Sequence, residues 1–330
     1  MALESVRWGI IGCGDVTEVK SGPAFQKVEN SELVAVMRRT GELAKDYAER
    51  HNVPKWYDDA DALINDPEVD AVYIATPPAS HKEYAIKVAQ AGKPVYVEKP
   101  MALNSAECEE MIVVCKEAGV PLYVSFYRRA MPRFLKIKEL IESNAIGEVR
   151  FVKTTQYQKV AEDVLDKDNL PWRVQPELAG GGLFFDLASH TIDLLDFLLG
   201  PITDVKGFAS NQAGHYPAED IVTGTYLFES GVHGTGSWCF SAFENVDMNE
   251  IIGSKGKISF STFSNDPILL TTSEGTQEWS FEQPKHVHQP LIETLVAELT
   301  GVDANCSCTG ETALRTSKVM EELVKSHYKD

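Results

Sequence analysis

Short apolar runs alternate with amphipathic helical patterns along the first third of the chain, and this alternation strongly limits the folds open to it. The runs are Trp8 to Ile11, Leu33 to Met37, Ala71 to Ala75, Pro94 to Val97 and Leu122 to Val124. Strands that are apolar throughout are typical of parallel sheets covered on both faces, with a helix connecting each strand to the next. Residues 1–125 are therefore predicted to form an α/β domain with a doubly wound parallel sheet.

The pattern changes after about residue 125 and indicates a second domain over residues 126–330. Strands with period-two character are expected at Val149 to Gln156, Val205 to Ala209, Ile221 to Phe228, Val232 to Phe240, Ile258 to Thr262 and Gln277 to Phe281. Turn signals such as Glu229-Ser230-Gly231 join neighbouring runs, which favours a large, mostly antiparallel open sheet. Helices are expected at Pro132 to Glu142, Leu183 to Leu199, Leu291 to Leu299 and Thr312 to Ser326, so this domain is α+β.

Composition excludes several classes of partner. The 330 residues carry a formal net charge of -18, which disfavours binding to nucleic acid and to anionic membranes. We find no export signal and no apolar run long enough to span a bilayer. The six cysteines include no C-x-x-C pair, which fits a cytoplasmic protein. Cys306 and Cys308 lack neighbouring metal ligands, and no metal site is predicted.

A pair of glycines follows the first apolar run, in Gly12-Cys13-Gly14-Asp15-Val16-Thr17. Gly12 would permit a tight turn and Gly14 would let the backbone approach a pyrophosphate at the start of the next helix, where Asp15 and Val16 lie. Thr17 stands where glycine or alanine is usual. A plain structural turn is the alternative, but the position after a first strand favours a dinucleotide site in a Rossmann domain.

Two arginines, Arg38 and Arg39, follow the second run, where an acidic residue usually meets the ribose of NAD. A guanidinium presents a planar fork of donors that suits a 2′-phosphate, so NADP is favoured and NAD is less favoured. The alternative is that both arginines are simply solvated.

Further candidate cofactor contacts follow the apolar run Ala71 to Ala75. Thr76 and Pro77 come after the run that ends at Ala75, and His81 falls near the start of the next helix. These residues are predicted to lie near the cofactor, although an exposed histidine at an ordinary helix start competes for His81.

The segment Glu98-Lys99-Pro100 ends the apolar run Val95 to Val97. The carboxyl ends of parallel strands face the ligand crevice, and Pro100 forces a turn that holds Lys99 in place. Lys99 is thus a candidate catalytic group and Glu98 a cofactor-side neighbour. A solvated lysine at the start of a loop is the alternative.

A second cluster of candidate residues follows the triple glycine Gly180 to Gly182. Asp186 and His190 are four residues apart at the beginning of an apolar helix, so they share a face. The carboxylate can orient the imidazole for proton exchange with a substrate. A structural Asp-His pair or a metal pair is the alternative, and the metal pair lacks further ligands. Upstream, Trp172-Arg173 could cover a polyhydroxylated ligand, or could be an interior tryptophan beside a surface arginine.

In the order and spacing of these motifs, the chain resembles the glucose-fructose oxidoreductase / inositol dehydrogenase / rhizopine-catabolism family of NAD(P)-dependent sugar oxidoreductases, over essentially its whole length. The carriers are Gly12-x-Gly14, Glu98-Lys99-Pro100, Trp172-Arg173, the triple glycine, Asp186-x-x-x-His190 and Glu250-Ile251-Ile252-Gly253-Ser254-Lys255-Gly256. It departs from the family at Thr17 and in the missing acid after the second strand.

The resemblance implies a Rossmann domain, a second domain whose open sheet makes a homodimer or homotetramer, and a catalytic set of Lys99, Asp186 and His190. Tyr127 and Arg128, with Trp172 and Arg173, are expected to contact substrate. Members similar to 1,5-anhydro-D-fructose reductase share the Trp-Arg pair and use NADPH. The predicted function is an NAD(P)-dependent dehydrogenase or reductase acting on CH-OH groups, which transfers a hydride between nicotinamide and a secondary alcohol or ketone of a sugar, cyclitol or related polyol. A non-catalytic NAD(P)-sensing regulator with the same fold is the alternative.

Overall fold

The structure is a computed structural model that describes residues 3–302 and 305–328. These residues form two compact units, and each is described by itself. The first unit comprises the chain up to Met131 and the segment Pro284–Leu314. The second comprises Pro132–Gln283 and the residues from Arg315 onward.

The segment Pro284–Leu314 differs from the predicted division, which placed it in the second domain. It carries α10 (Gln289–Leu299), whose side chains Leu291, Ile292 and Leu295 are buried. α10 packs against α2 (Gly22–Phe25) and against the 3₁₀ turn η2 (Tyr127–Ala130), both of the first unit. Burial of this apolar face accounts for the return of the chain to the first unit.

The first unit is built on a six-stranded sheet in the order β3-β2-β1-β4-β5-β6, in which every neighbouring pair is parallel. The strands are β1 (Val6–Ile11), β2 (Ser31–Met37), β3 (Lys55–Tyr57), β4 (Ala71–Ile74), β5 (Val95–Val97) and β6 (Leu122–Val124). β4, β5 and β6 are buried along their whole length, as a sheet covered on both faces requires. The predicted doubly wound parallel sheet is confirmed, with β3 as an additional short edge strand.

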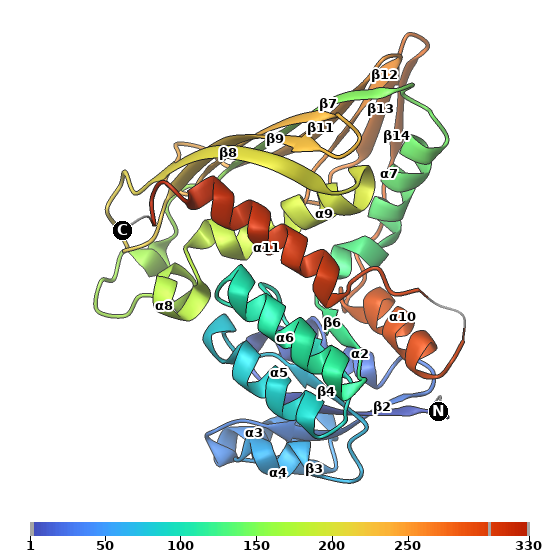
Figure 1. Ribbon diagram of the computed structural model, residues 1–330, viewed down its shortest axis with the longest axis vertical. Helices are drawn as coiled ribbons and strands as arrows, with labels where there is room; N and C mark the ends of the chain where they lie inside the picture. The colour runs from blue at the N-terminus through green and yellow to red at the C-terminus, as the bar shows by residue number, and fades with distance from the viewer. Residues whose placement is uncertain (1–2, 303–304, 329–330) are drawn as a thin grey trace. The chain divides into compact units, whose positions relative to one another are not determined.

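Helices connect these strands. They are α1 (Asp15–Val19), α2, α3 (Gly41–His51), α4 (Ala60–Ile64), α5 (His81–Gln90), which follows the 3₁₀ turn η1 (Pro78–Ser80), and α6 (Ser105–Ala118). α5 and α6 lie side by side (Figure 1). The ends of α6 follow from its sequence, because Asn104 accepts a hydrogen bond from the amide of Glu107 and Gly119 adopts a left-handed conformation.

The second unit is built on an eight-stranded sheet in the order β14-β13-β12-β11-β7-β10-β9-β8. The strands are β7 (Val149–Tyr157), β8 (Ile202–Ser210), β9 (Ile221–Phe228), β10 (His233–Cys239), β11 (Val246–Gly253), β12 (Gly256–Phe260), β13 (Ile268–Thr272) and β14 (Gly275–Trp279). β7 and β10 are parallel and the other neighbouring pairs are antiparallel. The prediction of a large, mostly antiparallel sheet is confirmed.

The helical segments of the second unit are α7 (Pro132–Glu142), the 3₁₀ turns η3 (Glu162–Val164) and η4 (Trp172–Val174), α8 (Pro176–Ala179), a π-helical turn η5 (Phe184–Ala188) and α9 (Ser189–Leu199). α11 (Gly310–Val324) runs from the end of the first unit into the second. The helix predicted over Leu183 to Leu199 is thus a π-helical turn followed by an α-helix. Phe184 anchors this turn by packing edge-on against Trp238 of β10, at 5.2 Å between ring centroids.

Candidate functional site

The glycine turn after β1 has the geometry expected of a pyrophosphate-binding loop. Gly12 has φ +90°, and a Cβ there would lie 2.7 Å from Thr76 Cγ2, so only glycine fits. A Cβ at Gly14 would meet only Gly12 O, at 3.8 Å. Protein packing therefore requires Gly12, whereas the open space beside Gly14 fits the close approach of a ligand to the backbone.

Thr17, the departure from the glycine pattern, is accommodated without loss of the turn. Its side chain is buried and its Oγ1 donates a hydrogen bond to Gly14 O at 2.8 Å. The carbonyl of Thr17 accepts a hydrogen bond from the Tyr47 hydroxyl of α3, also at 2.8 Å. The threonine thus ties the turn to α3.

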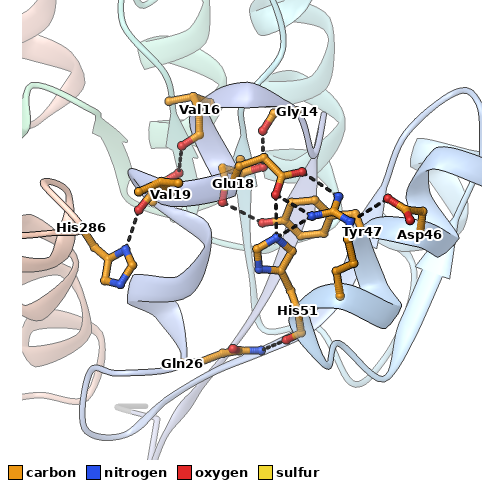
Figure 2. A network of polar contacts seen from close by, with 12 residues as sticks. Gly14, Val16, Glu18, Val19, Gln26, Asp46, Tyr47, His51 and His286 are labelled. Atoms are coloured by element: carbon orange, nitrogen blue, oxygen red, sulfur yellow. Dashed lines mark hydrogen bonds and ion pairs between the residues drawn. The ribbon is translucent and has the colours of Figure 1, made fainter.

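Asp15 and Val16 begin α1, which is only five residues long and is held by side chains from other elements (Figure 2). Glu18 accepts hydrogen bonds from both terminal nitrogens of Arg50 at 2.7 Å and lies 2.8 Å from His51 Nε2. The hydrogen bonds from Arg50 hold the pKa of the Glu18 carboxyl at about 2, well below its usual value. At the other end of α1, Val19 O lies 2.5 Å from His286 Nδ1.

Arg38 and Arg39 are exposed at the carboxyl end of β2. The amide of Arg38 donates to Tyr57 O of β3, which fixes its backbone. Burial raises the pKa of the Cys13 thiol to about 11, and the positive charge of Arg38 partly offsets this increase. The field of the guanidinium therefore reaches the glycine turn, which contains Cys13. An exposed cation beside this turn suits a phosphate group.

Thr76, Pro77 and His81 surround the end of β4. His81 is fully buried, with Nε2 2.6 Å from Thr76 O and Nδ1 3.0 Å from Pro100 O. Burial lowers the pKa of this imidazole despite the neighbouring carbonyls. His81 therefore joins the segment after β4 to the segment after β5, and its contact with a cofactor stays a prediction.

Glu98 and Lys99 follow β5. The Glu98 side chain is buried, accepts a short hydrogen bond from the Tyr73 hydroxyl and accepts another from the backbone amide of Lys99 at 3.2 Å. Lys99 is partly exposed, and its peptide bond to Pro100 is cis. The Glu98 carboxylate is thus hydrogen-bonded to the backbone amide of Lys99.

A buried polar network that sequence reasoning missed extends from Glu98. Its further members are Tyr96, Ser125 and His288, whose polar atoms lie between 3.0 and 3.3 Å apart. Tyr127 stacks on the His288 ring, and Arg128 donates to the Tyr127 hydroxyl at 2.9 Å. The two tyrosines inside predicted strands, Tyr73 and Tyr96, were the available signal, because a buried hydroxyl needs a partner.

In the second unit, Asp186 lies in the π-helical turn and His190 in the first turn of α9. Arg173 Nε lies 3.3 Å from Asp186 Oδ2, and the Arg173 guanidinium stands 4.6 Å from the Trp172 ring centroid. His190 is buried and meets the Phe263 ring edge-on. The Trp-Arg pair and the predicted acid are thus brought together. Orientation of His190 by Asp186 stays a prediction.

The triple glycine before this turn is held by a residue that the sequence did not single out. Glu219 is fully buried, and both of its carboxylate oxygens accept from the Gly182 amide, at 2.9 and 3.0 Å. Tyr328 donates to the same carboxylate at 2.5 Å. Burial raises the pKa of Glu219 to about 7.

Lys99 belongs to the first unit, whereas Asp186 and His190 belong to the second. Within the described ranges, no group of three or more His, Cys, Asp or Glu side chains could hold a metal ion. Helices in the same ranges are all too short or too polar to cross a membrane.

The parallel sheet and the glycine turn define a dinucleotide-binding protein of the Rossmann class. Residues 6–126 match the model of the oxidoreductase family with an NAD-binding Rossmann fold, and residues 134–259 match the GFO/IDH/MocA C-terminal domain. The chain belongs to this oxidoreductase family. The predicted family and the predicted enzyme class, an NAD(P)-dependent dehydrogenase or reductase, are confirmed.

Three relatives illustrate the likeness. The chain is 42% identical over 318 residues to Oxidoreductase P35 of Formosa agariphila, covering 96% of this chain and 97% of that protein. It is 28% identical to 1,5-anhydro-D-fructose reductase of Ensifer adhaerens, covering 92% and 91%. Aldose-aldose oxidoreductase from Caulobacter crescentus, solved with glycerol, superposes with a TM-score of 0.85 at 28% identity, covering 97% and 96%.

Proposed function

We propose that this enzyme transfers a hydride between NADP and a secondary alcohol or ketone of a sugar, cyclitol or related polyol. The observation that carries the proposal is the position of Lys99. It follows buried Glu98 at the carboxyl end of β5, in the same parallel sheet whose β1 leads into the Gly12 turn. Carboxyl ends of such strands form the ligand crevice.

The residues present fit the cofactor. The backbone at Gly14 is open, and the exposed guanidinium of Arg38 acts on the same turn, which suits the 2′-phosphate of NADP better than an unphosphorylated ribose. The proposed contacts are Gly12, Gly14, Asp15, Val16, Arg38, Arg39, Thr76, Pro77, His81, Glu98 and Lys99. When bound, the nicotinamide ring gives or accepts the hydride at C4.

Three side chains would act on the oxygen of the reacting hydroxyl or ketone. In oxidation, His190 takes the hydroxyl proton, and in reduction it returns one. Asp186 orients the imidazole and stabilises its protonated form. Lys99 donates a hydrogen bond to the same oxygen and stabilises negative charge that develops there, although a lysine in a desolvated cleft can also be the proton donor itself.

The substrate class rests on relatives and on the aromatic-cation pairs of this chain. One relative is a 1,5-anhydro-D-fructose reductase and a similar structure is an aldose-aldose oxidoreductase. Trp172 and Tyr127 each carry a guanidinium over or near the ring, at 4.6 and 4.9 Å. The Trp172 ring beside the donors of Arg173 suits the apolar face and hydroxyl groups of a sugar, whereas the Tyr127 ring is stacked on His288.

The second unit would supply the substrate domain and the surface for a homodimer or homotetramer. Phe208 of β8 is 80% exposed and Met248 of β11 is also exposed, which fits a sheet face that another copy covers. We assign the enzyme to the cytoplasm, since all six cysteines are free thiols.

Steady-state kinetics of two variants test the proposal. Wild type and the variants Lys99→Met and His190→Ala are assayed for NADPH oxidation with ketoses, inososes and dicarbonyls, and for NADP reduction with polyols. Each variant should lose about 100- to 10,000-fold in kcat, because each lacks a group that acts on the reacting oxygen. NADPH binding, measured by fluorescence titration, should stay close to that of wild type.

Lys87→Met on α5 and Lys45→Met on α3 are controls for loss of a surface charge, because both side chains are at the surface. Both should turn over like wild type. The proposal fails if wild type binds NADPH but turns over no member of the panel, which would support a sensor. It also fails if Lys99→Met and His190→Ala react at the wild-type rate.

A further inference from the structure

The segment 284–288, between β14 and α10, contains two histidines, His286 and His288, that no sequence motif singled out. Lys27 Nζ lies 2.7 Å from His286 Nε2. On the other side of the ring, His286 Nδ1 lies 2.5 Å from Val19 O (Figure 2). An ammonium can only donate and a carbonyl can only accept, so Nε2 accepts and Nδ1–H donates. The amide of His288 donates to Lys20 O at 3.2 Å. The segment therefore satisfies carbonyls at the end of the short helix α1.

The His288 side chain continues from this anchor into the polar network beside Lys99. Only 1% of the residue is exposed. Its Nδ1 lies 3.0 Å from Ser125 Oγ, 3.3 Å from Tyr96 Oη and 3.7 Å from Glu98 Oε1. These three partners come from the carboxyl ends of β5 and β6 or their continuations, so one ring nitrogen meets both strand ends.

The face of the same ring supports a proposed substrate contact. Tyr127 stacks on His288 with 4.5 Å between ring centroids and 27° between the planes. Tyr127 in turn accepts a hydrogen bond from Arg128. His288 therefore holds the Tyr96 and Ser125 hydroxyls by its edge and Tyr127 by its face.

The imidazole performs this task without a charge. Burial, together with the positive charges of Lys20, Arg128 and Lys99, lowers the pKa of His288 to about 3. The ring is therefore neutral at physiological pH, and it adds no positive charge to those of Lys20, Arg128 and Lys99. It can still both donate and accept hydrogen bonds.

We propose that His288 is a positioning residue for the reaction, which holds Tyr127 by its ring face and the Tyr96 and Ser125 hydroxyls by Nδ1, next to the segment that carries Lys99. The inference rests on the proposed function of Lys99. His288 itself touches neither substrate nor cofactor in this account. Replacement of the ring by an apolar group would remove a hydrogen-bond partner from the Tyr96 and Ser125 hydroxyls, and their positions would change.

Two substitutions separate the ring nitrogen from the ring face. His288→Phe keeps the stacking on Tyr127 but removes Nδ1, whereas His288→Asn restores a polar atom near the position of Nδ1. We expect His288→Phe to lower kcat about 10- to 100-fold, because small displacements at a reacting centre have effects of that size. His288→Asn should recover most of kcat and show a raised KM, because the stacking on Tyr127 is lost. NADPH affinity should change little in either variant, since the His288 amide keeps its bond to Lys20 O.

A second measurement does not depend on turnover. The rate of reductive methylation of Lys99 in the cofactor-free protein, followed by peptide mass spectrometry, reports its surroundings. The methylation rate of Lys99, divided by that of Lys87 in the same sample, should differ severalfold from wild type in His288→Phe. In His288→Asn this ratio should stay near the wild-type value. His327→Phe, at a histidine outside this network, is the control. If His288→Phe does not fold, His288→Gln replaces it, because its amide extends past the Nδ1 position.

The outcomes are distinct from those that test the proposed function. If wild type turns over no substrate, the proposed function fails. If wild type is active but His288→Phe has wild-type kcat, or His288→Asn loses as much kcat as His288→Phe, the positioning role is overturned. A loss in kcat with unchanged Lys99 methylation would also overturn it.

Discussion

At the scale of single residues, the buried histidines of the first unit show how surroundings decide what a side chain can do. His81 and His288 both have pKa values lowered by burial, so both act through hydrogen bonds. His81 faces backbone carbonyls, whereas His288 faces hydroxyls and a carboxylate. A sequence shows that a histidine is present, but its partners come from segments that are distant along the chain.

Arg38 provides the residue-scale prediction on cofactor choice. Arg38→Ala should weaken NADPH binding about 10- to 100-fold, because a charge-assisted hydrogen bond contributes about 1.5 to 3 kcal/mol. NADH has no 2′-phosphate, so its affinity should change little. Fluorescence titrations with both nucleotides measure the two dissociation constants, with Lys45→Ala on α3 as an exposed control. Equal losses for NADPH and NADH would refute the assignment.

At the scale of elements, the turn from the triple glycine into α9 depends on Glu219. A Cβ at Gly182 would lie 2.8 Å from Ala218 Cβ and from Glu219 O, so the close approach needs glycine. The carboxylate then binds the Gly182 amide. This contact fixes the start of the segment that carries Asp186.

The raised pKa of Glu219 makes stability depend on pH in a defined direction. Its value rises from 4.5 to about 7 on folding, so the folded state binds more protons between these values. Its contribution is full below pH 4.5 and is lost as the pH rises through about 7. Glu219→Gln should remove this dependence, which amounts to about 3 kcal/mol for a shift of this size.

Urea unfolding at pH 5 and pH 8 measures this effect. The free energy of unfolding should fall more between the two pH values in wild type than in Glu219→Gln. Glu229→Gln, an exposed carboxyl after β9, should behave like wild type. The same pH dependence in wild type and Glu219→Gln would show that Glu219 does not titrate in this range.

Other elements show what sequence patterns can and cannot predict. Most strands of the parallel sheet were predictable because their apolar runs are short, rich in β-branched side chains and separated by helical patterns. β3 has only three residues and β11 contains Asp247, Asn249 and Glu250, so neither gives a clear strand pattern. The buried side chain of Asn249 in β11 accepts a hydrogen bond from Thr154 of β7. This contact forms only when the two strands pair in the sheet.

At the scale of the whole molecule, the chain does not divide at one point. The charged pair Glu98-Lys99 and the glycine turn were predictable from local sequence, because each lies directly after a strand. His288 was not, since it lies 190 residues beyond Glu98 and reaches the first unit only through the return of Pro284–Leu314. Long-range returns of this kind depend on packing of an apolar helix face, which a local pattern does not locate.

Transfer of an isotopic label from NADPH to the product tests hydride transfer directly. The enzyme is incubated with NADPH that carries deuterium at one or the other C4 position and with a ketone that it accepts, and the product alcohol is examined by mass spectrometry. If the enzyme transfers a hydride, one of the two labelled cofactors delivers its deuterium to the carbinol carbon. Product that carries no deuterium from either cofactor would contradict hydride transfer.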